Sequence, residues 1–267
     1  MQHQIEFTTR DRSVWLFILP GLGLILLLAL PLLALLWRAL EEGLLHYALT
    51  PMALSAMRLS MMTSGLSLLI SVVTGTPLAY ALARWRFRGR AALELLIDLP
   101  IVLPPAVAGL GLLVAFGRQG LFAAPLNLMG ISLPFTTAAV VLAQTFVSAP
   151  FFVRSARIGF ASIDPQIEEA GHVEGANQWQ LFRHIMLPLA GRALLTGAVL
   201  AWTRALGEFG ATILFAGNLQ GRTQTMPLAI YLGFERSIGV ALALSVMLIV
   251  VSFGLLAITR RLENRRK

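Results

Sequence analysis

Long runs of residues without a single charge dominate this sequence and decide what it can fold into. Five such runs lie at residues 14–37, 59–83, 99–117, 119–153 and 237–259. A helix needs roughly 20 apolar residues to cross a hydrocarbon core about 30 Å thick, so each run is long enough to supply one. Of the 267 residues, 57% are hydrophobic and 13% are charged, against about 25% charged in a typical soluble domain. The sequence therefore predicts an all-α, polytopic membrane protein.

We expect about six transmembrane helices, at residues 14–37, 56–83, 95–116, 132–153, 190–215 and 237–259. The first part of the run 119–153 is expected to be a loop, because Pro125 and Pro134 interrupt it. Pro104 and Pro105 are expected to bend or delay the third helix, which neighbouring helices in a bundle tolerate.

The basic residues favour one side of the predicted membrane. When the loops between the expected spans are assigned alternately to two sides, one side receives fourteen basic residues and the other receives four. Basic residues are enriched in cytoplasmic loops, so we expect the richer side and both termini to be cytoplasmic. The fourteen are Arg10, Arg12, Arg84, Arg86, Arg88, Arg90, Arg154, Arg157, Arg183, Arg260, Arg261, Arg265, Arg266 and Lys267.

Several kinds of chemistry are disfavoured by residues that the sequence lacks. It has no cysteine, and its single lysine is the last residue, Lys267. A phosphate-binding loop needs a lysine within the fold, so ATP hydrolysis is expected on a separate chain. The four histidines form no H-E-x-x-H pattern. We therefore expect no catalytic residue, no metal site and no cofactor bound by this chain.

The segment 154–188, expected in the cytoplasm, has a more polar composition than its surroundings. Asp164-Pro165 is typical of a helix start, with a capping acceptor followed by proline at the first helical position. Glycines at 171 and 175 predict two short helices with a loosened junction. Glu168 and Glu174 are expected to be solvated side chains rather than contacts.

A specific motif lies within this segment. Glu169-Ala170-Gly171 is followed after three residues by Gly175 and, nine residues later, by Ile185-Met186-Leu187-Pro188. This spacing resembles the signature loop of ABC importer permeases, E-A-A, three residues, G, nine residues, I-x-L-P. Gly171 replaces the second alanine, a small-for-small change.

The resemblance implies the type I importer fold and a coupling helix that docks into a groove of an ATP-hydrolysing subunit. In that family the glycine makes the turn, and the glutamate faces the ATPase or stabilises the loop. The alternative interpretation is an interfacial amphipathic hairpin that only anchors the loop.

Two ionisable residues, Arg204 and Glu208, lie inside the fifth expected span. They are four residues apart, so on a helix they share a face and can pair. Ionisable residues at membrane depth are costly and face a bundle interior or an aqueous cavity. The pair either stabilises helix packing or places Arg204 where it biases a pathway toward anions. The candidate pathway or gate residues are Arg204, Gly207, Glu208, Phe209, Gly210 and Thr212.

Three further segments, residues 99–109, 215–218 and 221–227, resemble the branch of the permease family that carries tetrahedral oxyanions. The last two resemble the molybdate and tungstate members, whereas 98–100 and 106–109 equally resemble sulfate or thiosulfate permeases. Asp98 is expected to cap the third helix rather than face the pore.

The resemblance implies a set of partners and a cellular location. The partners are a second permease copy (a homodimer), two ATPase subunits carrying ATP and Mg, an extracytoplasmic oxyanion-binding protein and the bilayer, with no nucleic acid. The place is the plasma (inner) membrane of a bacterium or archaeon. The expected organisation is a cytoplasmic N-terminus with the first helix (1–54), a permease domain (55–258) and a basic tail (259–267).

The alternative from a different class is a carrier driven by an ion gradient. Such carriers usually contain internal repeats and carboxylates at the membrane midplane that bind the coupling ion. This chain has one intramembrane carboxylate, offset by Arg204, and no convincing repeat.

Overall fold

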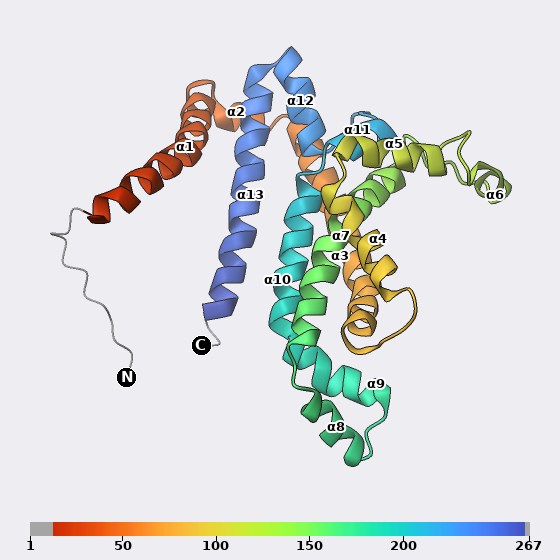
Figure 1. Cartoon of the computed structure of the whole chain (residues 1–267). Helices are drawn as coiled ribbons and strands as arrows, with labels where there is room; N and C mark the ends of the chain where they lie inside the picture. The colour runs from red at the N-terminus through yellow and green to blue at the C-terminus, as the bar shows by residue number, and fades with distance from the viewer. Residues whose placement is uncertain (1–12, 265–267) are drawn as a thin grey trace.

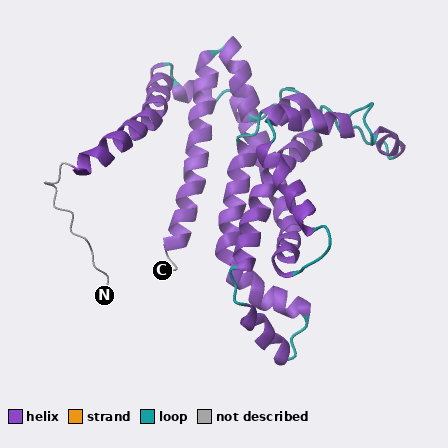
Figure 2. Ribbon diagram, in the orientation of Figure 1, coloured by secondary structure: helices purple, strands orange, loops and turns teal. Residues whose placement is uncertain are grey.

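Three long helices, α3, α7 and α10, form the centre of the molecule, and the other elements surround them (Figure 1). The computed structural model describes residues 13–264, with side chains described for residues 20–257. Helices and connecting loops make up this described part (Figure 2), so the all-α prediction is confirmed. The elements are α1 (Ser13–Glu41), α2 (Leu44–Ala48), α3 (Pro51–Arg84), α4 (Arg90–Val102), α5 (Pro105–Phe116), α6 (Ala123–Leu128), α7 (Thr137–Ala161), α8 (Pro165–Val173), α9 (Gln178–Leu181), the π-helical segment η1 (Phe182–Met186), α10 (Leu187–Leu206), α11 (Gly210–Ala216), α12 (Met226–Arg236) and α13 (Ile238–Asn264).

Close packing of small residues joins α7 to α10. Gly159 lies directly against Ala193, and a Cβ atom added to Gly197 would lie 2.8 Å from the Cβ of Ser155. Within a membrane the hydrophobic effect does not drive helices together, so association depends on such close approach and on interhelical hydrogen bonds. Larger buried side chains, including Phe152 and Phe160, fill the space toward α3.

A row of buried hydroxyl groups runs along α3 and ties it to its neighbours. The Trp202 indole on α10 donates to the Ser64 hydroxyl over 3.0 Å. The Met226 amide at the start of α12 donates to the Ser60 hydroxyl over 2.7 Å. Ser67 and Ser148 pair hydroxyl to hydroxyl at 3.4 Å. These bonds fix the register of α3 against three other helices.

The predicted spans agree with the structure in number, and two of them differ in shape. Among the described residues, five helices are long and apolar enough to cross a membrane, and α4 with α5 forms a sixth, bent candidate.

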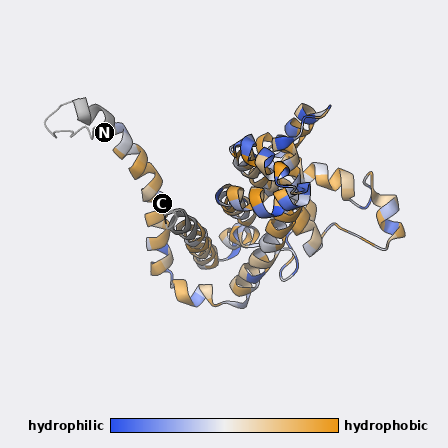
Figure 3. Ribbon diagram, turned by 90° about the horizontal axis from the view of Figure 1, so that it is seen from below, coloured by the Kyte–Doolittle hydropathy of each residue, from blue (hydrophilic) through white to orange (hydrophobic). Residues whose placement is uncertain are grey.

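Helix α1 lies apart from the central helices and packs against α2 and α13 (Figure 1). Its exposed leucines require an apolar environment such as lipid or another subunit. Seen from below, hydrophilic residues gather where α8 and α9 lie, while α1 is mostly hydrophobic (Figure 3).

The bend expected at Pro104 and Pro105 is confirmed, and it divides the predicted span 95–116 into two helices, α4 and α5. The chain bends by 118° between α4 and α5. Leu103 and Pro104 are extended at the bend, with ψ of 135° and 134°. A residue that precedes proline is forced out of the α conformation, and the Pro104-Pro105 doublet imposes this on two residues in succession.

The prediction of one helix over 190–215 is wrong, because α10 ends at Leu206 and α11 begins at Gly210.

The fourth span begins at Thr137 rather than at 132, with the Thr136 hydroxyl capping it. The expected loop before it contains the short helix α6. Arg10, Arg12 and residues 265–267, on which the predicted position of the termini depends, lie outside the described residues.

Candidate functional site

The first half of the signature loop (residues 164–188) is α8, which begins and ends by local capping. The Asp164 carboxylate accepts a hydrogen bond from the Gln166 amide over 2.9 Å, with Pro165 at the first helical position. After the helix, Gly175 adopts a φ of 84°. The Gly175 amide then bonds to the His172 carbonyl, and the Ala176 amide to the Gly171 carbonyl, each over 3.0 Å. This Schellman closure needs a left-handed residue, which explains the glycine.

The second half of the loop is α9, which runs into a transmembrane helix. Asn177 and Gln180 form a reciprocal capping box at its start. The π-helical segment η1 then carries the chain into α10, so that 178–206 is one continuous helical span. Pro188 is the second residue of α10, which follows the π turn directly. Proline has no N–H group to donate to an α-helical hydrogen bond, and its ring would collide with the carbonyl four residues earlier. The wider π turn makes room for the proline ring.

The signature residues occupy distinct positions within this hairpin. Glu169 and Ala170 lie exposed on α8. Gly171 faces α9, where an added Cβ would run into Leu181 and would lie 3.2 Å from Ile185. Glycine in place of the alanine of the family pattern therefore lets α8 close onto α9. Ile185 lies in η1, and Leu187 and Pro188 begin α10.

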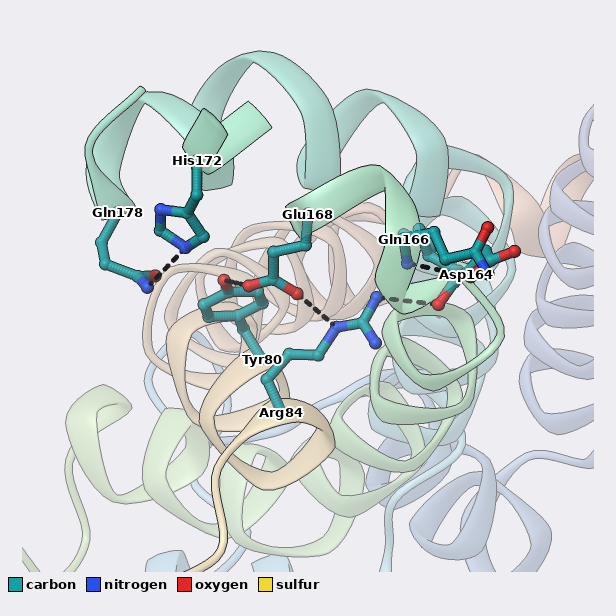
Figure 4. A network of polar contacts seen from close by, with 8 residues as sticks. Tyr80, Arg84, Asp164, Gln166, Glu168, His172 and Gln178 are labelled. Atoms are coloured by element: carbon teal, nitrogen blue, oxygen red, sulfur yellow. Dashed lines mark hydrogen bonds and ion pairs between the residues drawn. The ribbon is translucent and has the colours of Figure 1, made fainter. Parts of the chain in front are cut away.

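Glu168 was expected to be solvated, and that prediction is wrong. Its side chain is 16% exposed and forms an ion pair with Arg84, 3.2 Å between Oε2 and Nε. The Tyr80 hydroxyl donates to the other carboxylate oxygen over 2.8 Å. Arg84 also donates to the Ile163 carbonyl over 2.9 Å. Figure 4 shows this network joining α3 to α8.

Two cavities flank the network. One, of about 500 Å³, lies between the loop that follows α3 and helix α8, and its lining includes Arg84, Arg86, Arg90, Glu168, Glu169 and His172. The other, of about 380 Å³, is lined by Pro77, Tyr80, Trp85, Gln178, Trp179 and Phe182. The first lining is charged with both signs, and the second is largely aromatic.

The predicted pairing of Arg204 with Glu208 is present, across a helix break. Arg204 Nη1 lies 2.7 Å from Glu208 Oε2, and the two side chains are 28% and 1% exposed. The other Glu208 oxygen accepts a bond from the Ala211 amide over 2.7 Å. Glu208 therefore neutralises an arginine at the end of α10 and caps the start of α11.

Close packing holds the two helix breaks together. A Cβ atom added to Gly210 would lie 2.7 Å from the Cβ of Pro105, and one added to Gly109 would lie 2.8 Å from the backbone of Ala211. The Phe209 ring packs against Tyr231, with ring centroids 5.4 Å apart.

The other two pathway candidates flank the break. Gly207, which ends α10, is exposed, whereas Thr212 is fully buried on α11. All six candidates therefore lie at or beside one junction.

Asp98 does not cap a helix, contrary to prediction, because α4 begins eight residues earlier, at Arg90. It lies in the middle of α4 and lines a small cavity with Glu94, Arg154 and Arg157. The Glu94 oxygen Oε1 forms ion pairs with Arg90 Nε at 2.9 Å and with Arg157 Nη1 at 2.7 Å.

No group of three or more histidine, cysteine, aspartate or glutamate residues suited to a metal ion occurs in the described part of the chain.

Residues 75–267 match the family model described as "Binding-protein-dependent transport system inner membrane component". The chain belongs to this family. It is a multi-pass inner-membrane permease subunit of an ABC importer.

Curated relatives and solved structures agree with this assignment. The molybdenum transport system permease protein ModB of Mycobacterium tuberculosis is 42% identical over 242 residues, 91% of each chain. A probable sulfate transport system permease protein of Chlorella vulgaris is 35% identical over 216 residues, covering 80% of this chain and 81% of the relative. The fold is similar to a chain in the crystal structure of a bacterial alginate ABC transporter with a bound periplasmic protein. The TM-score is 0.76 at 18% identity, covering 96% of this chain and 95% of that one.

Proposed function

We propose that this chain forms the membrane path of an importer for molybdate, or for the related oxyanion tungstate. The observation that supports this substrate is the 42% identity, along nine-tenths of both chains, to a permease named for molybdenum transport. In this proposal the chain carries out no reaction. ATP and Mg are bound and used by two partner ATPase subunits.

The signature loop is the proposed contact with the ATPase. Glu169 and Ala170 are exposed on α8, and this exposure supports the proposed contact. Gly175 provides the turn, and Ile185, Leu187 and Pro188 join the hairpin to α10. Closure of two ATPase subunits on ATP would move two such loops together and tilt the spans, so that the path opens outward.

The junction between α10 and α11 is the proposed pathway element. Arg204 keeps about a quarter of its surface exposed while its partner Glu208 is buried, so the accessible charge is positive. A positive charge favours an anion, and the nearby carboxylate prevents that field from holding the anion too tightly. Gly207, Phe209, Gly210 and Thr212 shape this junction.

The proposed assembly has two copies of this chain, two ATPase subunits and an extracytoplasmic binding protein that delivers the oxyanion. Both termini and the signature loop are placed in the cytoplasm on the basis of the arginine distribution. The proposed organisation is the first helix up to residue 54, the permease domain over 55–258 and the basic tail.

Sulfate is the second candidate substrate, supported by the 35% identity to a probable sulfate permease. Molybdate and sulfate are both tetrahedral dianions, so a positively charged junction does not by itself distinguish them. The binding protein is therefore the proposed source of most of the selectivity.

The experiment is ATP hydrolysis in liposomes that hold this chain with its cognate ATPase. Binding protein is added empty, then loaded to equal saturation with molybdate, tungstate or sulfate. We expect molybdate- or tungstate-loaded protein to stimulate hydrolysis most. Strongest stimulation by sulfate would reassign the substrate. If the ATPase neither assembles with the chain nor responds to any loaded protein, the proposed import of an oxyanion fails.

A further inference from the structure

Helix α8 is attached to the rest of the molecule at few points. None of its residues is buried. Gly171 touches Leu181 of α9, and His172 lies 3.3 Å from Gln178. Both contacts stay within the hairpin. Glu168 is different, because its two partners, Tyr80 and Arg84, belong to α3.

The contact with α3 is built more firmly than a surface ion pair. Arg84 and Glu168 are 10% and 16% exposed. Exposed ion pairs contribute little, whereas bonds to a charged group shielded from water are stronger. Arg84 also holds the Ile163 carbonyl in the link between α7 and α8. One arginine thus fixes both the beginning of α8 and its middle.

Tyr80 is itself held in place by aromatic neighbours. Its ring packs against Phe160 of α7 at 5.4 Å and against Phe182 of η1 at 5.0 Å between centroids. Trp85 lies edge-on at 6.2 Å. The hydroxyl that Glu168 binds therefore belongs to a side chain that cannot move without disturbing three segments.

We propose that Tyr80, Arg84 and Glu168 form a latch that makes α8 and the cytoplasmic end of α3 move as one unit. A displacement imposed on α8 then reaches the membrane by two routes, through α9 into α10 and through the latch into α3. The three are positioning residues, since they act through the helices that they join. This inference rests on the proposed function, in which an ATPase subunit moves α8.

The first test measures how many oxyanions are transported per ATP hydrolysed, in liposomes with the ATPase and loaded binding protein. Glu168→Gln loses the ion pair, and we expect roughly a tenfold lower ratio because a charge-assisted contact is lost. Tyr80→Phe loses one hydrogen bond, and we expect a loss of about threefold. ATP hydrolysis and the amount of assembled complex should stay at the wild-type level. Glu174→Gln is the matched control, because Glu174 is an exposed glutamate at the end of the same helix.

The second test replaces the latch with a covalent link. The chain has no cysteine, so Tyr80→Cys with Glu168→Cys provides the only thiol pair. The untreated double variant should transport poorly per ATP, and a short crosslinker that joins the two thiols should restore the ratio. In each single-cysteine variant, the same reagent should not increase the number of oxyanions transported per ATP. A structural role alone predicts no such rescue.

The outcomes separate the latch from the proposed function. Inactivation by the crosslink would show that α3 and α8 must separate during transport, and this overturns the latch. A wild-type ratio in both Glu168→Gln and Tyr80→Phe overturns it as well. If transport by the wild-type chain never depends on its ATPase, the proposed function is refuted, and the latch is refuted with it because it rests on that function.

Discussion

The molecule holds two carboxylate–arginine pairs of similar chemistry and different construction. Arg204 and Glu208 are four residues apart and bridge the break between α10 and α11. Arg84 and Glu168 come from helices far apart in the sequence and join α3 to the signature loop. The first pair joins the ends of two successive helices, whereas the second joins two segments that are distant in the sequence. The difference shows that a pair within one segment can be predicted from its spacing in the sequence, whereas a long-range pair is seen only in the fold.

The largest expected effect is from Glu208→Ala. It leaves Arg204 without its counter-charge and the Ala211 amide without its acceptor. Leaving the buried Ala211 amide without an acceptor costs about 1–3 kcal/mol, and Arg204 also loses its counter-charge, so we expect a clear fall in thermal stability and more than about tenfold lower transport. Glu208→Gln keeps an acceptor for the amide and should recover most of the stability. Thermal unfolding in detergent checks both, and wild-type stability of Glu208→Ala would contradict the pairing described.

Next in size is Gly210→Ala, which tests the packing around the first pair. The added methyl group would lie 2.7 Å from the Cβ of Pro105, so α11 must move away from α5. We expect transport to fall roughly fivefold, since overpacking costs about 1–3 kcal/mol. Gly191→Ala on α10 is the matched control, because no neighbouring atom lies within 4 Å of the added methyl group. Equal transport by the two variants would show that this close contact has no functional importance.

A smaller effect is expected from Arg84→Lys, which tests the second pair without removing its charge. Lysine can still meet Glu168, but it lacks the planar fork that reaches Glu168 and the Ile163 carbonyl together. We expect a loss of about 1 kcal/mol in stability, the value of one hydrogen bond. Denaturation of the purified chain measures it, and a loss as large as that of Glu208→Ala would remove the distinction between the two pairs.

An effect of similar size concerns the turn beside the latch. Gly175 has a φ of 84° and open space around its Cα. Gly175→Ala should therefore act through backbone strain alone, about 1 kcal/mol, and reduce ATPase association by about fivefold. Gly175→Asn should be milder because asparagine tolerates this conformation. Co-purification of the ATPase with each variant gives the comparison, and equal losses for alanine and asparagine would argue against strain as the cause.

The sequence predicted what local chemistry determines. Uncharged runs indicated the spans, Asp164-Pro165 indicated the start of α8, and the spacing of Arg204 and Glu208 indicated their pairing. The proline doublet indicated the bend at Pro104-Pro105, whereas the break at Gly207 was missed because the apolar residues around it favoured an unbroken helix. Tyr80 and Glu168 are 88 residues apart, and no pattern in either segment indicates the other. Their contact follows only from the packing of α3 against α7.

The uninterrupted path from α9 through the π turn into α10 turns a small rotation into a large shift. Helix α9 runs at an angle to α10 (Figure 1), and the 20 residues of α10 extend about 30 Å at 1.5 Å per residue. Such a rod is a lever whose far end carries Arg204. A rotation of about 5° around the start of α10 displaces that far end by about 3 Å, given this length. Under the proposed function, a tilt of this one helix by a few degrees is therefore enough to move Arg204 relative to the junction that it lines.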